Sequence, residues 1–324
     1  MPSLRSKGPH VALALVASLC VVMHDALAEG QTRTPPLVPP GETGRRITED
    51  GLLANYFPAP RRGPAILVLG GSVGGLSLDM NNTAKALQAE GFGVLHLSYF
   101  RGPGQNAGLE LIPLEYFATA LAWLRRQPEV DATRVGILGG SRGAEAALLV
   151  AVRHPELKAV IAALPSSVVW PGIPAEEKDV PISSAWSESG KPVPHMPPAP
   201  YDPQKGGTMA DNFAVRLKGL PEHPEAIIPV EKIAGRVLLV CGEADHVWPS
   251  CPMARQIEQR LREHRRPAPI LLAYREAGHL AFGLPVPPDD PRLTTVGGTA
   301  EGTNAARSDS WSRVIAFLKA TLVS

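Results

Sequence analysis

Short apolar runs alternate with amphipathic stretches from Leu52 to the end of the 324-residue chain, and this alternation constrains the fold more than any other feature. The runs lack a period-two pattern, so each strand is expected to be covered on both faces. Such strands, separated by helices, predict a mostly parallel, doubly wound α/β sheet. The predicted strands are 52–57, 65–69, 93–98, 134–138, 158–164, 236–241 and 269–274. The predicted helices are 78–89, 114–126, 144–153, 253–263 and 304–322.

One long stretch, residues 165–230, interrupts this alternation and is called the insert below. It is dense in proline, which removes backbone donors and leaves room for few regular elements. A long irregular segment between two strands of a compact domain is usually a functional cover or disordered. Its position near the candidate catalytic loops favours a cover. We predict a linker at 29–50 and one folded domain at 51–324.

Residues 1–28 have the pattern of an export signal. Arg5 and Lys7 give a positive start, residues 11–23 are almost entirely apolar, and Ala26-Leu27-Ala28 fits a small-x-small cleavage site. No later stretch of about 18 apolar residues occurs, so no stable membrane insertion is expected after signal removal. The protein is predicted to be exported, either to a periplasm or outside the cell; a buried N-terminal helix is the alternative.

Charge and cysteine content exclude several classes of protein. Lys and Arg number 32 against 31 Asp and Glu, so the net charge of +1 predicts no nucleic-acid partner. A hydrophobic content of 44% supplies ample core and argues against global disorder. Three cysteines exclude a disulfide-dense scaffold and a four-cysteine zinc site.

Two smaller features stay open at this stage. Cys241 and Cys251 bracket a candidate catalytic loop and either form a disulfide that stiffens it or remain two buried thiols. Trp170, Trp186 and Trp248 lie in or near the insert. They either line an acyl pocket or pack without touching substrate.

The segment Gly139-Gly140-Ser141-Arg142-Gly143 follows a predicted strand and precedes a predicted helix. A strand–Ser–helix turn is tight, so glycines must flank the serine for the backbone to pass. The turn exposes the serine hydroxyl at the carboxyl end of the sheet, where the helix N-terminus favours negative charge. Ser141 is therefore the candidate nucleophile; a plain tight turn is the alternative.

A nucleophilic serine needs a base and an orienting acid, which follow it in this kind of fold in the order Asp or Glu, then His. Of nine histidines, His279 alone lies on a loop just past a predicted strand in that order. The strand 236–241 runs into a loop that carries Glu243 and Asp245. Asp245 is the predicted acid and Glu243 the alternative. His279 would deprotonate Ser141 and later protonate the leaving group.

The oxyanion of an acyl-transfer intermediate needs backbone N–H donors. One is predicted from Arg142, directly after the nucleophile. The other is predicted from Ser72 or Val73, in the glycine-rich loop at 70–75. A phosphate cradle is the rival interpretation of that loop, but neither dinucleotide-binding nor P-loop spacing is present.

Several motifs in order resemble the C-terminal catalytic domain shared by acyl-CoA thioesterases and bile acid-CoA:amino acid N-acyltransferases, within the α/β-hydrolase superfamily. The resemblance runs from about Pro64 to the C-terminus. Its motifs are Gly74-Gly75-Leu76, Leu114-Glu115-Tyr116-Phe117, Gly140-Ser141-Arg142-Gly143-Ala144-Glu145, Gly190-Lys191-Pro192, Ile228-Pro229-Val230-Glu231, Gly242-Glu243-Ala244-Asp245-His246-Val247-Trp248, Gly278-His279, Gly297-Gly298-Thr299 and Asp309-Ser310-Trp311.

The resemblance implies an α/β-hydrolase fold and cleavage of an acyl thioester through an acyl-enzyme. Members that conjugate amino acids carry cysteine as nucleophile, so Ser141 favours hydrolysis. The animal members carry a large N-terminal β-sandwich domain, whereas here a short linker precedes the sheet. We therefore expect a serine acyl hydrolase without metal or organic cofactor. Its expected partner is a small acyl thioester or carboxylic ester; an acyltransferase and a non-catalytic binding protein are the alternatives.

Overall fold

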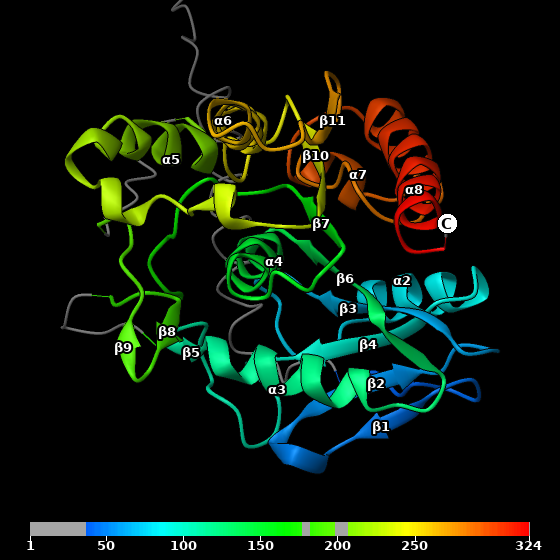
Figure 1. The fold of residues 1–324 in the computed structure, drawn as a ribbon. Helices are drawn as coiled ribbons and strands as arrows, with labels where there is room; N and C mark the ends of the chain where they lie inside the picture. The colour runs from blue at the N-terminus through cyan, green and yellow to red at the C-terminus, as the bar shows by residue number, and fades with distance from the viewer. Residues whose placement is uncertain (1–36, 177–181, 198–206, 324) are drawn as a thin grey trace, which may run out of the picture. The chain divides into compact units, whose positions relative to one another are not determined.

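A single central sheet organises the computed structural model, which describes residues 37–176, 182–197 and 207–323 (Figure 1). Within these residues the sheet has eight strands in the order β1-β2-β4-β3-β6-β7-β10-β11. β2 runs antiparallel to β1 and β4, and all other neighbours are parallel. The strands are β1 (Arg45–Ile47), β2 (Leu53–Phe57), β3 (Gly63–Leu69), β4 (Gly93–Ser98), β6 (Val130–Gly140), β7 (Ala159–Ala163), β10 (Arg236–Gly242) and β11 (Ile270–Tyr274).

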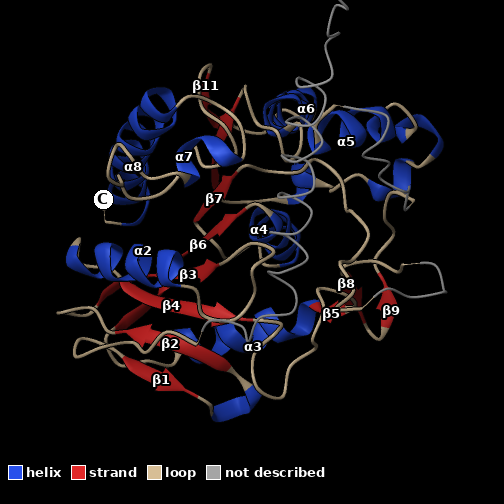
Figure 2. Cartoon of the chain, turned by 180° about the vertical axis from the view of Figure 1, so that it is seen from behind, coloured by secondary structure: helices blue, strands red, loops and turns tan. Residues whose placement is uncertain are grey.

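Helices cover both faces of the sheet, as Figures 1 and 2 show from opposite sides. On β3, Leu67 and Leu69 point into the core under α3 and α4, whereas Ile66 and Val68 point into the core under α2 and α8. Both faces of the strand are therefore buried, which explains why its sequence does not alternate between apolar and polar residues. The helices are α2 (Leu78–Ala89), α3 (Leu114–Arg125), α4 (Arg142–Arg153), α5 (Met209–Leu217), α6 (Ser250–Glu263), α7 (Arg292–Thr295) and α8 (Ala300–Leu322).

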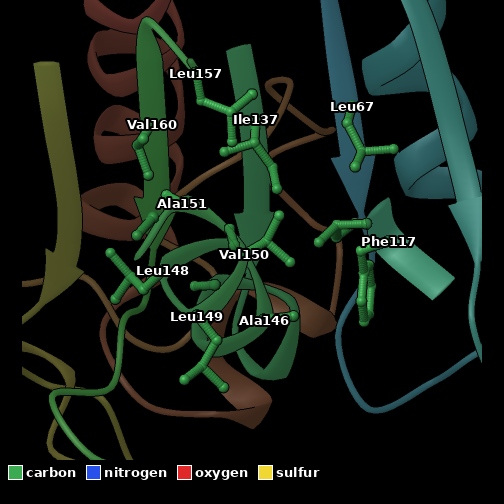
Figure 3. Close-up of a cluster of buried hydrophobic side chains, with 14 of the residues drawn as sticks. Leu67, Phe117, Ile137, Ala146, Leu148, Leu149, Val150, Ala151, Leu157 and Val160 are labelled. Carbon is green, nitrogen blue, oxygen red and sulfur yellow. The ribbon is translucent and has the colours of Figure 1, made fainter. Parts of the chain in front are cut away.

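The helix α4 is the most deeply buried of these helices, and it positions the site described below. Its residues 142–151 are all buried. Figure 3 shows its side chains beside Ile137 of β6 and Val160 of β7, with Phe117 of α3 close by. Each fully buried Leu or Val contributes roughly 1.5–3 kcal/mol to folding. The N-terminus of α4 is consequently held by the core itself.

The sheet begins earlier than the sequence pattern predicts. β1 lies inside the predicted linker and pairs with β2 through Arg45–Tyr56 and Ile47–Ala54. A three-residue edge strand with two arginines is too short and too polar to register as an apolar run. β6 starts at Val130, four residues before its predicted start, and its pairing with β3 shifts register near Gly63.

The described part of the insert holds more regular structure than its prolines suggest. Its strands β8 (Trp186–Glu188) and β9 (Lys191–Pro192) form a small second sheet with β5 (Ile112–Pro113), which precedes the insert, and α5 lies beside α6 (Figure 1). The sequence 204–220 contains no proline, and Thr208 and Asp211 close a capping box at the start of α5. Three 3₁₀ turns follow, at Leu220–Glu222, Pro224–Ala226 and Val230–Lys232.

The predicted export signal at 1–28 lies outside the described residues and stays a prediction, as do the domain boundaries. Within the described ranges, no helix is both long enough and apolar enough to cross a membrane.

Candidate active site

Ser141 lies at the turn between β6 and α4, in a backbone conformation that side chains rarely adopt. Its φ is 56° and its ψ is −122°, and its N–H donates to the carbonyl of Ala163 at 2.8 Å. The flanking glycines make this turn possible. A Cβ on Gly139 would lie 2.0 Å from the Gly143 carbonyl oxygen, and a Cβ on Gly143 would lie 2.3 Å from the Gly70 carbonyl oxygen. The glycines of the motif are therefore required by close backbone packing.

His279 lies on the loop after β11, and its ring reaches Ser141. The distance from His279 Nε2 to Ser141 Oγ is 2.9 Å. The loop is held by a hydrogen bond from the His279 N–H to the Val296 carbonyl at 3.1 Å. A Cβ on Gly278 would lie 2.0 Å from the Gly297 carbonyl oxygen, so the residue before the histidine must be glycine.

Asp245 accepts hydrogen bonds at both carboxylate oxygens and is 8% exposed. Its Oδ2 lies 2.8 Å from His279 Nδ1 and accepts from Ser250 Oγ at 2.7 Å. Its Oδ1 accepts from the N–H groups of Val247 at 2.9 Å and Trp248 at 3.3 Å. These contacts fix the orientation of the carboxylate toward the histidine ring.

Glu243, the alternative acid, points elsewhere. It pairs with Arg255 of α6 at the surface. Cys241, at the end of β10, and Cys251, at the start of α6, form a disulfide across a separation of ten residues. The covalent link therefore encloses the acid loop, residues 242–248.

The oxyanion loop, residues 70–75, passes directly beside Ser141. A Cβ on Gly71 would lie 3.2 Å from Ser141 Cβ and 3.7 Å from its Oγ. Tyr99 donates its hydroxyl to the Gly70 carbonyl at 2.5 Å, and Arg101 Nη1 donates to the Val73 carbonyl at 3.0 Å. Burial raises the pKa of Tyr99, so its hydroxyl stays protonated as a donor. These two contacts hold the predicted Ser72 or Val73 donor in place.

Arg142 opens α4, so its backbone N–H has no carbonyl one turn earlier to bond. Its side chain is buried and pairs with Glu145 at 2.7 Å. Glu145 also accepts from the indole N–H of Trp186 at 2.7 Å and the backbone N–H of Trp170 at 3.1 Å. Burial raises the pKa of Glu145, and the charge of Arg142 opposes that shift. Because Arg142 Nη2 donates to the Pro171 carbonyl at 2.9 Å, this ion pair ties the insert to the serine helix.

Three aromatic rings of the insert and the acid loop, Trp170, Phe213 and Trp248, extend from the histidine. The centroid distances are 4.7 Å from Trp170 to Phe213, 6.2 Å from Phe213 to Trp248 and 5.8 Å from Trp248 to the His279 ring. We call these three residues the aromatic cluster. Of the three tryptophans singled out in the sequence, Trp248 therefore lies beside the histidine, Trp170 is linked to it through Phe213 and Trp248, and Trp186 donates to Glu145.

Sequence reasoning missed two supporting residues. Ser250 is buried and donates to Asp245, and Tyr99 is buried and donates to the oxyanion loop. Ser250 follows the acid loop directly, and a serine at the start of a helix gives a faint signal. Tyr99 sits just after β4, and no local pattern points from it to Gly70, which is 29 residues away.

The described residues hold no cluster of three or more side chains suited to a metal ion. A pocket of about 220 Å³ opens between the insert and α6, lined among others by Ser167, Leu220, Ile227 and Ile257. Neither Ser141 nor His279 lines it.

Comparisons with solved structures agree with the observed architecture. An esterase from Pyrococcus furiosus superposes with a TM-score of 0.53 at 16% identity, covering 89% of this chain and 99% of the esterase. A dienelactone hydrolase-like phosphotriesterase from metagenomic libraries gives a TM-score of 0.53 at 16% identity, covering 86% and 98%. At such low identity the likeness shows the fold alone.

Sequence relatives are more informative. Acyl-coenzyme A thioesterase 6 of Mus musculus is 29% identical, covering 86% of this chain and 65% of its own length. Acyl-coenzyme A amino acid N-acyltransferase 1 of Mus musculus is 28% identical, covering 88% of this chain and 67% of its own. The chain thus spans about two thirds of the length of these relatives.

The family model described as BAAT / Acyl-CoA thioester hydrolase C terminal matches residues 112–324. This region is more than half of the chain and includes Ser141, Asp245 and His279. The resemblance inferred from the motifs is therefore confirmed. The chain belongs to the BAAT / acyl-CoA thioester hydrolase C-terminal family and has the α/β-hydrolase fold.

Proposed function

We propose that the protein is a serine acyl hydrolase in which Ser141 is the nucleophile, His279 the general base and Asp245 the orienting acid. One observation carries the proposal: Ser141 Oγ, His279 and Asp245 Oδ2 are joined by distances of 2.9 and 2.8 Å. A serine hydroxyl attacks a carbonyl only weakly unless a base within hydrogen-bond reach takes its proton. A base oriented by a buried acid supplies that condition.

The reaction proceeds in two steps. Ser141 Oγ attacks the acyl carbonyl as His279 Nε2 takes its proton, and Asp245 stabilises the resulting imidazolium through Nδ1. His279 returns the proton to the leaving thiol or alcohol, which departs and leaves an acyl-serine. Water then attacks the acyl-serine with His279 again as base, and the acid leaves as Ser141 regains its proton.

The oxyanion of each tetrahedral intermediate binds to the N–H of Arg142 and that of Ser72 or Val73. The fixed start of α4 and the tethered oxyanion loop support this assignment, because donors that do not move at the moment of reaction stabilise charge best. Removing one such donor costs roughly 2.7–4 kcal/mol in other enzymes.

Acyl thioesters are the proposed substrate class, because the thioesterase relative and the family description both concern acyl-CoA. Carboxylic esters come second, because the predicted export would separate the enzyme from cytosolic acyl-CoA. An acyltransferase is the alternative favoured by the N-acyltransferase relative. Adding an amine such as glycine and measuring the ratio of amide to free acid distinguishes a transferase from a hydrolase.

The experiment that tests the proposal compares kcat/KM on an acyl-CoA and on the oxygen ester of the same acyl chain, with Ser141→Ala as blank. We expect hydrolysis by the unaltered protein, loss with Ser141→Ala, and labelling of Ser141 by a fluorophosphonate. A preference for the thioester of about tenfold, or about 1.4 kcal/mol, would assign the thioester class. Undiminished turnover in Ser141→Ala would refute the nucleophile.

Export is proposed on the pattern of residues 1–28 alone. N-terminal sequencing of protein recovered from outside the cytosol should begin just after Ala28. Protein that stays in the cytosol with Met1 intact would contradict export and strengthen acyl-CoA as substrate.

A further inference from the structure

Arg216 of α5 is a partly buried cation that pairs with no carboxylate in the described part of the chain. Its Nη2 donates to the Pro197 carbonyl at 2.7 Å, and its Nε is buried without an acceptor. Burial lowers the pKa of Arg216 to about 10, and the nearby charge of Arg142 adds to this shift. Removing a guanidinium from water without a counter-ion costs free energy, so such a position usually serves an anion.

Two further donors without acceptors lie around the same ring. The indole N–H groups of Trp170 and Trp248 are buried and have no acceptor among the described residues. Arg216 lies 5.3 Å from the Phe213 centroid, and both tryptophans also pack on Phe213. Buried polar groups are nearly always hydrogen-bonded in folded proteins. Three unsatisfied donors around one side chain therefore indicate an acceptor that arrives with a ligand.

Packing alone explains only part of this arrangement. The Arg216 guanidinium lies 4.9 Å from the Trp170 ring centroid, a cation–π contact of the kind that contributes roughly 0.5–2 kcal/mol. That contact uses the face of the indole and satisfies neither the Arg216 Nε nor the indole N–H. If Arg216 served only to pack α5 against Trp170, the Arg216 Nε and the indole N–H would not need to remain without acceptors.

The donors lie beside the candidate active site. The Trp248 ring is 5.8 Å from the His279 ring, and the Trp170 backbone N–H donates to Glu145 of the serine helix. The start of α5 is tied to the acid loop by a hydrogen bond from the Ala210 N–H to the His246 carbonyl at 3.1 Å. A substrate attacked by Ser141 would thus have part of its structure near Arg216.

We propose that Arg216, Trp170 and Trp248 form an anion subsite that binds a compact negatively charged group of the acyl substrate. The proposal rests on the proposed function, because the anion is part of the molecule that Ser141 attacks. A guanidinium and indole N–H groups match the acceptor oxygens of a carboxylate or a phosphate. The anion is either a carboxylate at the far end of the acyl chain or a phosphate of the leaving group.

Two substrate pairs separate these sources. The first pair compares the 4-nitrophenyl ester of a monocarboxylic acid with the 4-nitrophenyl half-ester of the dicarboxylic acid of equal chain length. The second compares an acyl-CoA with the same acyl thioester of N-acetylcysteamine, which lacks phosphates. For each pair we take the ratio of kcat/KM for the substrate with the additional negative charge to kcat/KM for the substrate without it. The ratio is measured in the unaltered full-length protein, in Arg216→Gln, in Arg216→Lys and in Lys218→Gln. Lys218 is an exposed cation at the end of the same helix and serves as the matched control.

We expect Arg216→Gln to lower one ratio about tenfold, Arg216→Lys to keep part of it, and Lys218→Gln to leave both ratios unchanged. A fall in the first ratio places the anion on the acyl chain, and a fall in the second places it on the leaving group. If Arg216→Gln changes neither ratio, the subsite is refuted.

A second measurement needs no variant, in case Arg216→Gln does not fold. Fluorophosphonate labelling of Ser141 in the unaltered protein should be slowed by a free dicarboxylate or a nucleotide bisphosphate more than by a neutral analogue of equal size. Equal rates with the charged and the neutral compounds would refute the subsite and leave the proposed function intact. Absence of any labelling of Ser141 would instead refute the proposed function.

Discussion

Two buried carboxylates, Asp245 and Glu145, lie at the same end of the sheet and are used differently. Asp245 is 8% exposed and takes three of its four donors from within five residues of itself, with His279 as the fourth. Glu145 is fully buried and takes two of its three donors, on Trp170 and Trp186, from the insert.

The acid loop and the insert are therefore held in place by different kinds of contact. The carboxylate of the acid loop is held by donors from nearby residues and presents one oxygen to the histidine, while the loop backbone is fixed by the disulfide and by hydrogen bonds from Ala244 to Ala277 and from His246 to Val296. The insert contacts α4 through residues far away in the sequence. These contacts depend on the buried ion pair between Arg142 and Glu145. The Asp245 carboxylate is therefore placed for the proposed chemistry, whereas the Glu145 carboxylate holds the insert against α4.

The largest expected effect on activity is that of Asp245→Asn. An amide cannot stabilise the imidazolium and favours the wrong tautomer of His279, so kcat should fall by roughly 10⁴-fold while the protein stays folded. Steady-state kinetics with the thioester substrate, together with a thermal melt, checks both parts. Glu243→Gln is the matched control, and a comparable loss of kcat in that variant would show that the acid has been misassigned.

Glu145→Gln should act on stability more than on chemistry. It leaves the Arg142 guanidinium buried without a counter-charge, which costs about 3–5 kcal/mol in unfolding free energy. Glu188→Gln removes a more exposed pair, between Glu188 of the insert and Arg153 at the end of α4, and should cost at most about 1 kcal/mol. Urea unfolding of the two variants measures the difference. Equal losses would mean that the buried pair does not dock the insert.

The double variant Cys241→Ala and Cys251→Ala tests how much of the local order depends on the covalent link. Opening a loop of this length should lower the unfolding free energy by roughly 3 kcal/mol, mainly by freeing the unfolded chain. A thiol reductant should reproduce the loss in the unaltered protein and have no further effect on the variant. A reductant effect of equal size on both proteins would assign the loss to something other than this disulfide.

His96 of β4 is a third buried titratable group: it is fully buried, and neither ring nitrogen has a hydrogen-bond partner among the described residues. Burial lowers its pKa to about 3, with a smaller contribution from Arg46. In the unfolded chain, His96 binds a proton as the pH falls through about 6.5, whereas in the folded chain it stays neutral. The free energy of unfolding therefore falls below that pH by about 1.4 kcal/mol per pH unit.

His96→Leu removes this titration without leaving a buried polar group. Urea unfolding between about pH 6.5 and pH 4 should show a shallower loss of stability in the variant than in the unaltered protein. Parallel curves for the two proteins would show that His96 does not contribute to the acid sensitivity.

Much of the candidate site could be predicted because its signals are local. The glycines around Ser141, the helix after it, and His279 just past a strand each depend on a few neighbouring residues whose backbone demands are visible in sequence. Chain order then linked them. The partners of Glu145 could not be predicted, because Trp170 and Trp186 lie 25 and 41 residues away and reach it only after the insert folds back.

The edges of the fold were harder to predict for a related reason. β1 is three residues long and takes its strand character from pairing with β2, so nothing in its own composition marks it. α5 was hidden by the surrounding prolines, although its capping box and the proline-free run were present.

The doubly wound sheet, the turn that presents Ser141 and the order of the residues that follow it could be predicted from the sequence alone. These properties arise from burial patterns and backbone sterics, which act over a few residues. The packing of the whole chain was needed to show that Asp245 rather than Glu243 faces His279, that Cys241 and Cys251 are bonded, and that Arg216 has no counter-ion among the described residues. Each of these depends on distances between side chains that no local preference sets, and packing of the whole chain fixes them.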